Sequence, residues 1–300
     1  MNHATFFSPS YIGDLERAIW LRRSVETFFN GNATHIITVP NGDIPAFRRA
    51  LGQQKDVQLI PQEEFVDSYY YPDLLFRLAS RLAPSQLWRL KTHAGKSGWI
   101  IQQIVKLNCS QIIKDGAVVF LDSDLFFFRH FGLRDLGIDN SQRVLVRILP
   151  DSESAKHRHH IINSRLILDA PPGNTDYTYM GFPAIWYVDW LNQLHKHLEN
   201  VSGKHWQKAL FDVKFGISEY TIYGVFIDEI LKPRELYIRE EPYNLIAWDH
   251  ASFDNLKSAM LQNEKIPNNK ISLVIQSNIG IPTSEYEDML LHILSPHQER

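Results

Sequence analysis

Asp122 and Asp124 follow an apolar run directly, and their type and spacing suit a divalent cation. Residues 117–121 read Ala-Val-Val-Phe-Leu, as expected of a strand covered on both faces in a largely parallel sheet. Side chains two positions apart in extended backbone point to the same side, so these carboxylates should converge. Hard oxygen ligands of this kind suit Mg²⁺ or Mn²⁺, and a cation would relieve the repulsion between them. We therefore predict a metal site at this strand end.

The alternative interpretation is a strand that ends in a turn, with both aspartates solvated. A lone Asp-x-Asp would favour that alternative. Here, however, residues 125–128 read Leu-Phe-Phe-Phe, and unpaired carboxylates rarely lie in such apolar surroundings. The flanking residues therefore favour the metal site.

A third carboxylate, Glu219, stands at the predicted start of a helix. Ser218 is a good N-cap for a helix that runs to about Leu231. A glutamate in the first turn interacts favourably with the helix dipole and needs no further role. A carboxylate held by a capped helix at a site edge would also suit a general base. Both interpretations stay open at this stage.

Polar residues interrupt the helix predicted just before the Asp-x-Asp strand. Apolar side chains between residues 98 and 107 supply a buried face, whereas Gln102, Gln103 and Lys106 break it. Either these three are ordinary solvated positions, or one edge of the helix borders a ligand. The residues alone do not separate the two interpretations.

The elements that must position these groups alternate between strand and helix. Strands are predicted at 5–7, 35–39, 57–60, 117–121, 144–149, 165–168 and 271–275, and helices at 15–29 (with Asp14 as N-cap), 43–51, 61–96, 98–107 and 218–231. Such alternation predicts an α/β fold, Rossmann-like, with a mixed, mostly parallel sheet and helices on both faces of a single compact unit. Ligands bind beyond the carboxyl ends of such strands. Ser8, Tyr11 and Asp43 should lie there with the two aspartates.

Composition excludes several classes of protein. The 300 residues carry a formal net charge of −3 with no long run of one sign, so nothing indicates a nucleic-acid surface. The single Cys109 rules out an intramolecular disulfide and a multi-cysteine zinc site. Neither a signal peptide nor a membrane span is predicted. We expect a cytoplasmic protein with, at most, peripheral contact at the inner face of the membrane.

Two further segments stand out. Residues 151–160 form a polar loop with three histidines, which we interpret as solvated or mobile rather than metal-binding. Pro171-Pro172-Gly173 is the clearest break in the chain, and we predict a seam there between two halves, approximately 1–170 and 171–300.

Taken together, these motifs resemble glycosyltransferases of the GT-A fold, whose Asp-x-Asp motif holds a cation on a nucleotide-sugar diphosphate. They are most similar to a bacterial family of glycosyltransferases ascribed to polysaccharide synthesis. The shared motifs are Gly98-Trp99 with Gln102-Gln103 and Lys106-Leu107, then Leu121 to Asp124, then Ser218-Glu219-Tyr220 with Tyr223-Gly224. Ser8 to Tyr11 and Val39-Pro40 with Asp43 fit as well, so the resemblance spans most of the chain.

The resemblance implies a role for each matched residue. Asp124 would bind Mn²⁺ or Mg²⁺, and Asp122 would bind the metal or the ribose. Ser8, Tyr11 and Asp43 would border the nucleoside, while Gln103 and Lys106 would lie near the sugar or diphosphate. Glu219 would deprotonate the acceptor hydroxyl in an inverting reaction. A third metal ligand would come from the C-terminal region, where His250 is favoured over His292 and His297.

The resemblance also implies the substrates. The first half would bind the nucleotide sugar, with a UDP-sugar as the favoured sugar donor, and the second half would bind a glycan or lipid-linked glycan acceptor. Carbohydrate sites use aromatic faces, and residues 177–190 are rich in aromatics. From these we assign Tyr179 and Trp186 to acceptor binding.

Two other functions remain as alternatives. Phosphatases of the haloacid dehalogenase type also end a strand with Asp-x-Asp, but their motif normally lies near the N-terminus and precedes a small turn. A non-catalytic protein that binds nucleotide sugars or carbohydrates is the other alternative. Metal-dependent release of a nucleoside diphosphate is expected of neither.

Overall fold

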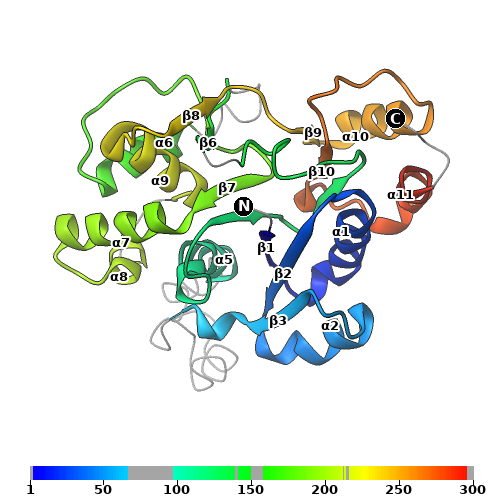
Figure 1. Cartoon of the computed structure of the whole chain (residues 1–300), viewed down its shortest axis with the longest axis horizontal. Coiled ribbons are helices and arrows are strands. Elements are labelled where there is room, and N and C mark those ends of the chain that lie inside the picture. The colour runs from blue at the N-terminus through cyan, green and yellow to red at the C-terminus, as the bar shows by residue number, and fades with distance from the viewer. Residues whose placement is uncertain are drawn as a thin grey trace, which may run out of the picture.

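A five-stranded sheet, ordered β3-β2-β1-β4-β7, occupies the centre of the computed structural model (Figure 1). Its strands are β1 (His3–Pro9), β2 (Asn32–Val39), β3 (Val57–Pro61), β4 (Ala117–Phe120) and β7 (Ala184–Tyr187). The first four are parallel, and β7 pairs antiparallel with β4. The structure describes residues 3–66, 97–138, 141–149, 158–211, 213 and 216–295.

Helices cover both faces of this sheet. In Figure 1, α5 (Ser97–Leu107) lies on one side, and α1 (Leu15–Phe28) and α2 (Ile44–Leu51) lie on the other. Neighbouring residues of β2 show the same division, because Ile36 belongs to the main core whereas Ile37 packs in a smaller cluster with Phe47 of α2. Alternate residues of a strand point to opposite faces, so each needs its own cover.

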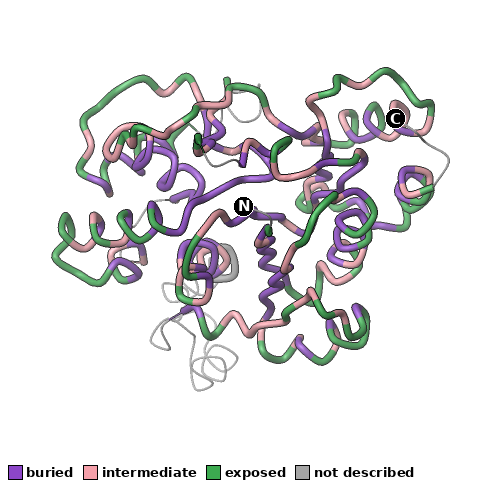
Figure 2. The backbone as a smooth tube through the Cα atoms, in the orientation of Figure 1, coloured by how far each residue is buried: buried purple, intermediate pink, exposed green. Residues whose placement is uncertain are grey.

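Two smaller sheets extend the molecule. One joins β5 (Leu125–Phe127), β10 (Ser272–Ile275) and β9 (Asn244–Ala247), and the other pairs β6 (Arg143–Val146) with β8 (Leu236–Arg239). The remaining helices are α6 (His159–Ile167), α7 (Val188–Ser202), α8 (Trp206–Phe211), α9 (Glu219–Val225), α10 (His250–Leu261) and α11 (Glu287–Leu294), and a π-helical turn, Phe226–Leu231, continues α9. Figure 2 shows the buried backbone following the central strands and the inner sides of the helices.

The structure confirms the predicted α/β class and its mostly parallel sheet with helices on both faces. One strand prediction is wrong, because residues 165–168 lie at the end of α6 and in the turn after it. Ile161, Ser164 and Arg165 are buried at helical spacing, whereas Leu166 is exposed, so the burial pattern is that of a helix. The structure also adds β7, which the sequence analysis did not predict.

Several predicted segments fall wholly or partly outside the described residues. The helix predicted at 61–96 lies there except for its first turn, a 3₁₀ helix at Gln62–Glu64. Of the polar loop at 151–160, residues 158–160 are described, and His159 and His160 begin α6. The division near residue 170 remains a prediction. Strands from both sides of it share all three sheets of the described chain, since β4 pairs with β7, β5 with β10 and β6 with β8.

Candidate active site

The loop that carries Asp122 and Asp124 connects the central sheet to the β5-β10-β9 sheet. It leaves the carboxyl end of β4, and its Ser123 hydroxyl donates to Ser10 Oγ at 2.9 Å, just beyond β1. The Ser277 N–H donates to Asp124 Oδ2 at 3.1 Å, and the Ile275 N–H donates to the Asp124 carbonyl at 3.0 Å. The loop is therefore held between β1 and the end of β10. As predicted, it lies beyond the carboxyl ends of parallel strands.

A buried lysine joins the first aspartate to the predicted base. Lys106 Nζ lies 2.7 Å from Asp122 Oδ1 and 2.8 Å from Glu219 Oε1. It also donates to the Tyr220 hydroxyl at 2.6 Å, and that hydroxyl donates to Asp122 Oδ2 at 3.0 Å. Three segments of the chain that are far apart in sequence thus meet at one point. We call Lys106, Asp122, Glu219 and Tyr220 the lysine cluster.

Electrostatics keep the lysine charged and the tyrosine protonated. Burial lowers the pKa of Lys106, but the carboxylates of Asp122 and Glu219 outweigh it and raise that pKa well above its usual value. Burial, with Asp122 close by, raises the pKa of Tyr220 well above its usual value. The cluster therefore presents an ammonium ion and a phenol as hydrogen-bond donors to the carboxylates.

Asp124 carries a charge that its surroundings disfavour. Burial, followed by repulsion from Asp122, raises the pKa of Asp124 to about 7, and the Ser277 N–H compensates only in part. Its second oxygen, Oδ1, has no hydrogen-bond partner among the described residues. Asp122 and Asp124 both offer hard carboxylate oxygens, and Asp124 ionises less readily than a free aspartate. A divalent cation would stabilise the ionised form of both side chains.

Asp14 is a site residue that the sequence analysis missed. It occupies the N-cap position of α1, as predicted, but its side chain makes no cap hydrogen bond to that helix. The carboxylate instead lies 3.1 Å from Arg17 Nη1, and it interacts electrostatically with both Asp122 and Asp124. Arg17 is fixed in turn by the Ile281 carbonyl at 3.0 Å. A residue that suits a helix start therefore faces the strand ends instead.

The residues predicted to border the nucleoside lie at the ends of β1 and β2. The Ile12 N–H donates to Asp43 Oδ2 at 2.9 Å, which brings the segment after β1 against the start of α2. Tyr11 beside it is half-exposed. Ser8 is buried and hydrogen-bonded to His35 Nε2 at 2.8 Å, so its hydroxyl is already engaged. Of the three, Tyr11 and Asp43 are the better placed to meet a ligand.

Gln103 lies on the same helix as Lys106, one turn earlier, and is almost fully buried. Neither its amide oxygen nor its amide nitrogen has a partner within the described part of the chain. An unpaired buried amide is costly, so such groups usually await a ligand or a water. Gln103 and Lys106 are therefore not solvated positions, and a ligand contact of Gln103 remains a prediction.

The Ser-Glu-Tyr-x-x-Tyr-Gly motif divides into site residues and packing residues. Ser218 is the N-cap of α9, as predicted, and accepts from the Thr221 N–H at 3.4 Å. Glu219 and Tyr220 enter the lysine cluster. Gly224 is required by packing, because a Cβ there would come within 2.1 Å of the Tyr179 ring. The glycine thus lets α9 approach the 177–180 segment closely.

The two predicted acceptor residues do not fit that role. Tyr179 is buried, and its hydroxyl donates to Asp228 Oδ2 at 2.8 Å. Trp186 is buried as well and stacks on Tyr223 with ring centroids 4.5 Å apart. Both rings are occupied by core packing, so neither offers a face to an acceptor.

His250 is exposed at the start of α10, one residue after the Asp249 N-cap. Within the described ranges, no three His, Cys, Asp or Glu side chains form a group that could hold a metal. The two aspartates thus stand without a third ligand of these types in this structure. Metal binding by His250 remains a prediction. His297 lies outside the described residues.

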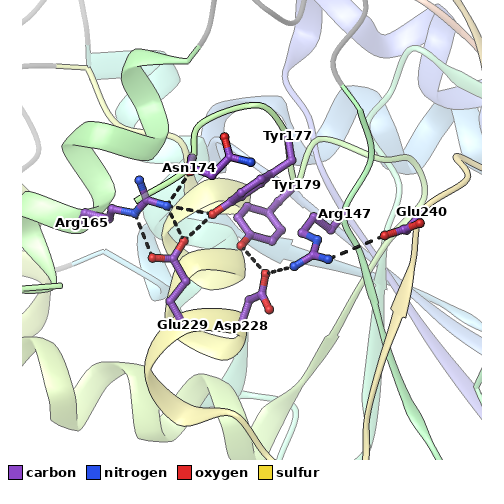
Figure 3. A network of polar contacts seen from close by, with 8 residues as sticks. All are labelled: Arg147, Arg165, Asn174, Tyr177, Tyr179, Asp228, Glu229 and Glu240. Atoms are coloured by element: carbon purple, nitrogen blue, oxygen red, sulfur yellow. Dashed lines mark hydrogen bonds and ion pairs between the residues drawn. The ribbon is translucent and has the colours of Figure 1, made fainter. Parts of the chain in front are cut away.

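A second charged network lies between α6, the 174–179 segment and the π-helical turn (Figure 3). Arg165 donates to Glu229 through both Nε and Nη2, at 2.8 and 2.9 Å, and Tyr177 donates to Glu229 Oε1 at 2.5 Å. Arg147 donates to Asp228 Oδ2 at 2.8 Å and lies 3.7 Å from Glu240. The π-helical turn places Asp228 and Glu229 side by side. We call this set the arginine network.

The family model described as "Family of unknown function (DUF6492)" matches residues 5–294. The chain belongs to this family. No curated protein matches the sequence significantly. Among solved structures, the apo form of mouse xyloside xylosyltransferase 1 is 12% identical with a TM-score of 0.49, and the alignment covers 93% of this chain and 100% of that one. This TM-score is too low to transfer any property from that structure. The fold of this DUF6492 member is therefore described from its own strand order.

A membrane span requires a helix of sufficient length and hydropathy. None of the helices in the described parts of the chain is both long and apolar enough to span a bilayer.

Proposed function

We propose that the protein is a metal-dependent glycosyltransferase that moves a sugar from a nucleotide sugar to a hydroxyl group of a glycan. We take a UDP-sugar as the sugar donor and inversion as the outcome. The observation that carries the proposal is the meeting of Asp122 and Asp124 with Lys106 and Glu219 at the carboxyl edge of the central sheet. This is the edge at which α/β sheets bind nucleotides.

The donor set fits a magnesium or manganese ion. Mg²⁺ usually binds through one or two carboxylates and completes its shell with substrate phosphates and water, so a third protein ligand is not essential. Asp122 and Asp124 would hold it, and Asp14 adds negative charge nearby. When bound, the cation would stabilise the charge that grows on the departing diphosphate.

The chain's own residues account for the remaining steps. Lys106 provides a second positive charge and orients Glu219 by binding its Oε1. Glu219 Oε2 has no partner among the described residues and would accept the proton of the attacking hydroxyl. The buried position of this carboxylate excludes bulk water from the proton transfer. Attack on the face of the sugar opposite the diphosphate would invert the anomeric carbon.

Calorimetric titration of UDP, GDP and CMP, with and without Mn²⁺, tests the proposal. We expect one nucleoside diphosphate to bind only with the metal, and we expect Asp124→Ala to abolish this binding and reduce transfer by more than about 1,000-fold. The circular dichroism spectrum should be unchanged, because Asp124 contributes one backbone hydrogen bond from Ser277.

Other outcomes would contradict the proposal. Metal-independent binding of CMP would indicate a CMP-activated sugar and a lesser role for the aspartates. If none of the three nucleotides binds, the phosphatase and the non-catalytic binding protein become the better interpretations.

A further inference from the structure

A cavity of about 630 Å³ opens beside the arginine network and β9. Small-molecule sites occupy roughly 300–1,000 Å³, so its size is that of a ligand site. One wall is formed by Asn244, Ile246 and Trp248, which alternate along β9 and the residue after it and therefore share a face. The facing wall includes Tyr177, Asn174 and Arg147 of the arginine network.

The cavity lies close to the aspartates through the sheet. The Gln276 N–H donates to the Ala247 carbonyl at 3.3 Å, which joins the end of β9 to the end of β10. Ser277, the next residue, donates its N–H to Asp124. Trp248 and Asp124 thus stand at the ends of strands in the same small sheet. A ligand in the cavity would lie beside the proposed nucleotide-sugar site.

The walls combine rigid aromatic and apolar surface with amides. The Tyr177 hydroxyl is fixed by Arg165 at 2.9 Å and by Glu229 at 2.5 Å, so the ring is held in place. Met180, Ile246 and Trp248 add apolar lining. Apolar faces of this kind pack against the C–H face of a sugar ring, while amides such as that of Asn174 bind hydroxyl groups.

The charges of the cavity disfavour an anion. Among the described residues that line it, Arg147 is the one cation, and Asp228 at 2.8 Å and Glu240 at 3.7 Å already neutralise this side chain. Asp176 and Glu240 add two carboxylates to the lining, and Asp176 is paired with the exposed Arg158 at 3.2 Å. A sugar with its own carboxylate would meet repulsion and find no free positive partner.

We propose that this cavity binds an uncharged sugar unit of the acceptor glycan and selects against acidic sugars. The inference rests on the proposed glycosyltransferase function and names the chemical class of its acceptor. It also corrects the acceptor assignment, since Tyr177 and Trp248 replace the buried Tyr179 and Trp186.

Saturation-transfer NMR with defined trisaccharides tests this inference. The probes are neutral trisaccharides of glucose, galactose, mannose and N-acetylglucosamine, with trigalacturonic acid as the charged counterpart of the galactose probe. We expect at least one neutral probe to bind and trigalacturonic acid to bind at least 10-fold more weakly. Trp248→Ala should weaken the binding of the neutral probe at least 10-fold. The matched control is Tyr237→Ala, which removes a half-exposed aromatic of β8 outside the cavity lining and should change nothing.

A charge reversal tests the selectivity itself. Glu240 is largely exposed, and Glu240→Lys removes one partner of Arg147 and adds a cation to the cavity. We expect it to improve binding of trigalacturonic acid at least 10-fold. No binding of any neutral probe, equal binding of the acidic one by the native protein, or no effect of Trp248→Ala would each overturn the inference.

The two proposals fail in different ways. If a nucleoside diphosphate binds with Mn²⁺ but no neutral trisaccharide binds, the acceptor cavity is wrong and the glycosyltransferase stands. If a neutral trisaccharide binds in a Trp248-dependent way but no nucleotide does, the cavity is a sugar site and the catalytic function is wrong.

Discussion

The lysine cluster and the arginine network use the same kinds of side chain to different ends. In the arginine network, Arg165 binds Glu229 through two nitrogens and Arg147 binds Asp228, so each arginine has its own carboxylate. In the lysine cluster, a single ammonium serves both Asp122 and Glu219. With Asp14 and Asp124 close by, four carboxylates share two cations, Lys106 and Arg17, in the part of the chain that the structure describes.

This difference in charge pairing is the one expected between a structural network and a binding site. A buried charge is stable when it is paired and costly when it is not. The arginine network satisfies its charges internally, which suits a wall that must stay rigid. The group around Asp124 does not, and Asp124 responds with a pKa of about 7. An excess of carboxylate at a strand end is what a cation would correct.

The largest stability effect should come from breaking the arginine network. Arg165→Ala removes a buried arginine and leaves the partly buried Glu229 beside Tyr177 without its cation, and we expect the free energy of unfolding to fall by about 3 kcal/mol. Urea denaturation measures this loss. As the matched control, Arg158→Ala removes an arginine whose ion pair with Asp176 is exposed and should cost less than about 1 kcal/mol. Equal losses in the two variants would show that the network is not a structural core.

Glu219→Gln should affect catalysis rather than stability. The amide keeps the shape of the side chain and a hydrogen-bond acceptor for Lys106, but it cannot take a proton. We expect kcat to fall about 100-fold or more, with nucleotide affinity changed by less than about 3-fold. Steady-state kinetics and calorimetry measure the two quantities. Glu229→Gln in the arginine network should leave kcat nearly unchanged, and a parallel loss of nucleotide affinity in Glu219→Gln would make Glu219 a binding residue.

The smallest predicted effect is a gain in stability, and it tests the charge of Asp124 most directly. The folded pKa of Asp124, about 7, lies above its usual 3.8, so ionisation at pH 8 opposes folding. Asp124→Asn should therefore raise the free energy of unfolding on the order of 1 kcal/mol at pH 8. The gain should shrink as the pH falls through 7 toward 4, where the folded carboxyl is protonated.

Thermal denaturation across this pH range, without metal, checks the prediction. Asp228→Asn provides the comparison, because it breaks a satisfied pair with Arg147 and should lose stability at pH 8. A loss of stability in Asp124→Asn would contradict the view that this carboxylate is under-neutralised.

Patterns of apolar residues made much of the fold predictable. The runs that became β1, β2, β3 and β4 were identified because buried strands of parallel sheets are apolar throughout. The same rule failed at 165–168, where Arg165 and Leu168 are two buried positions of a helical stripe and the turn after it. A short apolar run does not distinguish a strand from a helix face.

The candidate site was predictable where local motifs set it and not where tertiary contacts do. Asp122, Asp124 and Glu219 stood out because of their immediate neighbours in the sequence. Asp14 did not stand out, because its role depends on electrostatic interaction with the two aspartates, which follow it by more than one hundred residues. Trp248 did not stand out either, since its place on a cavity wall follows from the pairing of β9 with β10.

The attachment of Asp124 to Ser277 has a consequence for protein synthesis. A ribosome completes β4 and the two aspartates long before it reaches β10, yet Ser277 and the strand before it fix the second aspartate. The nascent chain therefore carries an incomplete centre until Ser277 has emerged. A transcript truncated before β10 would yield a protein that contains Asp122, Asp124 and Glu219 but lacks the strand that fixes Asp124.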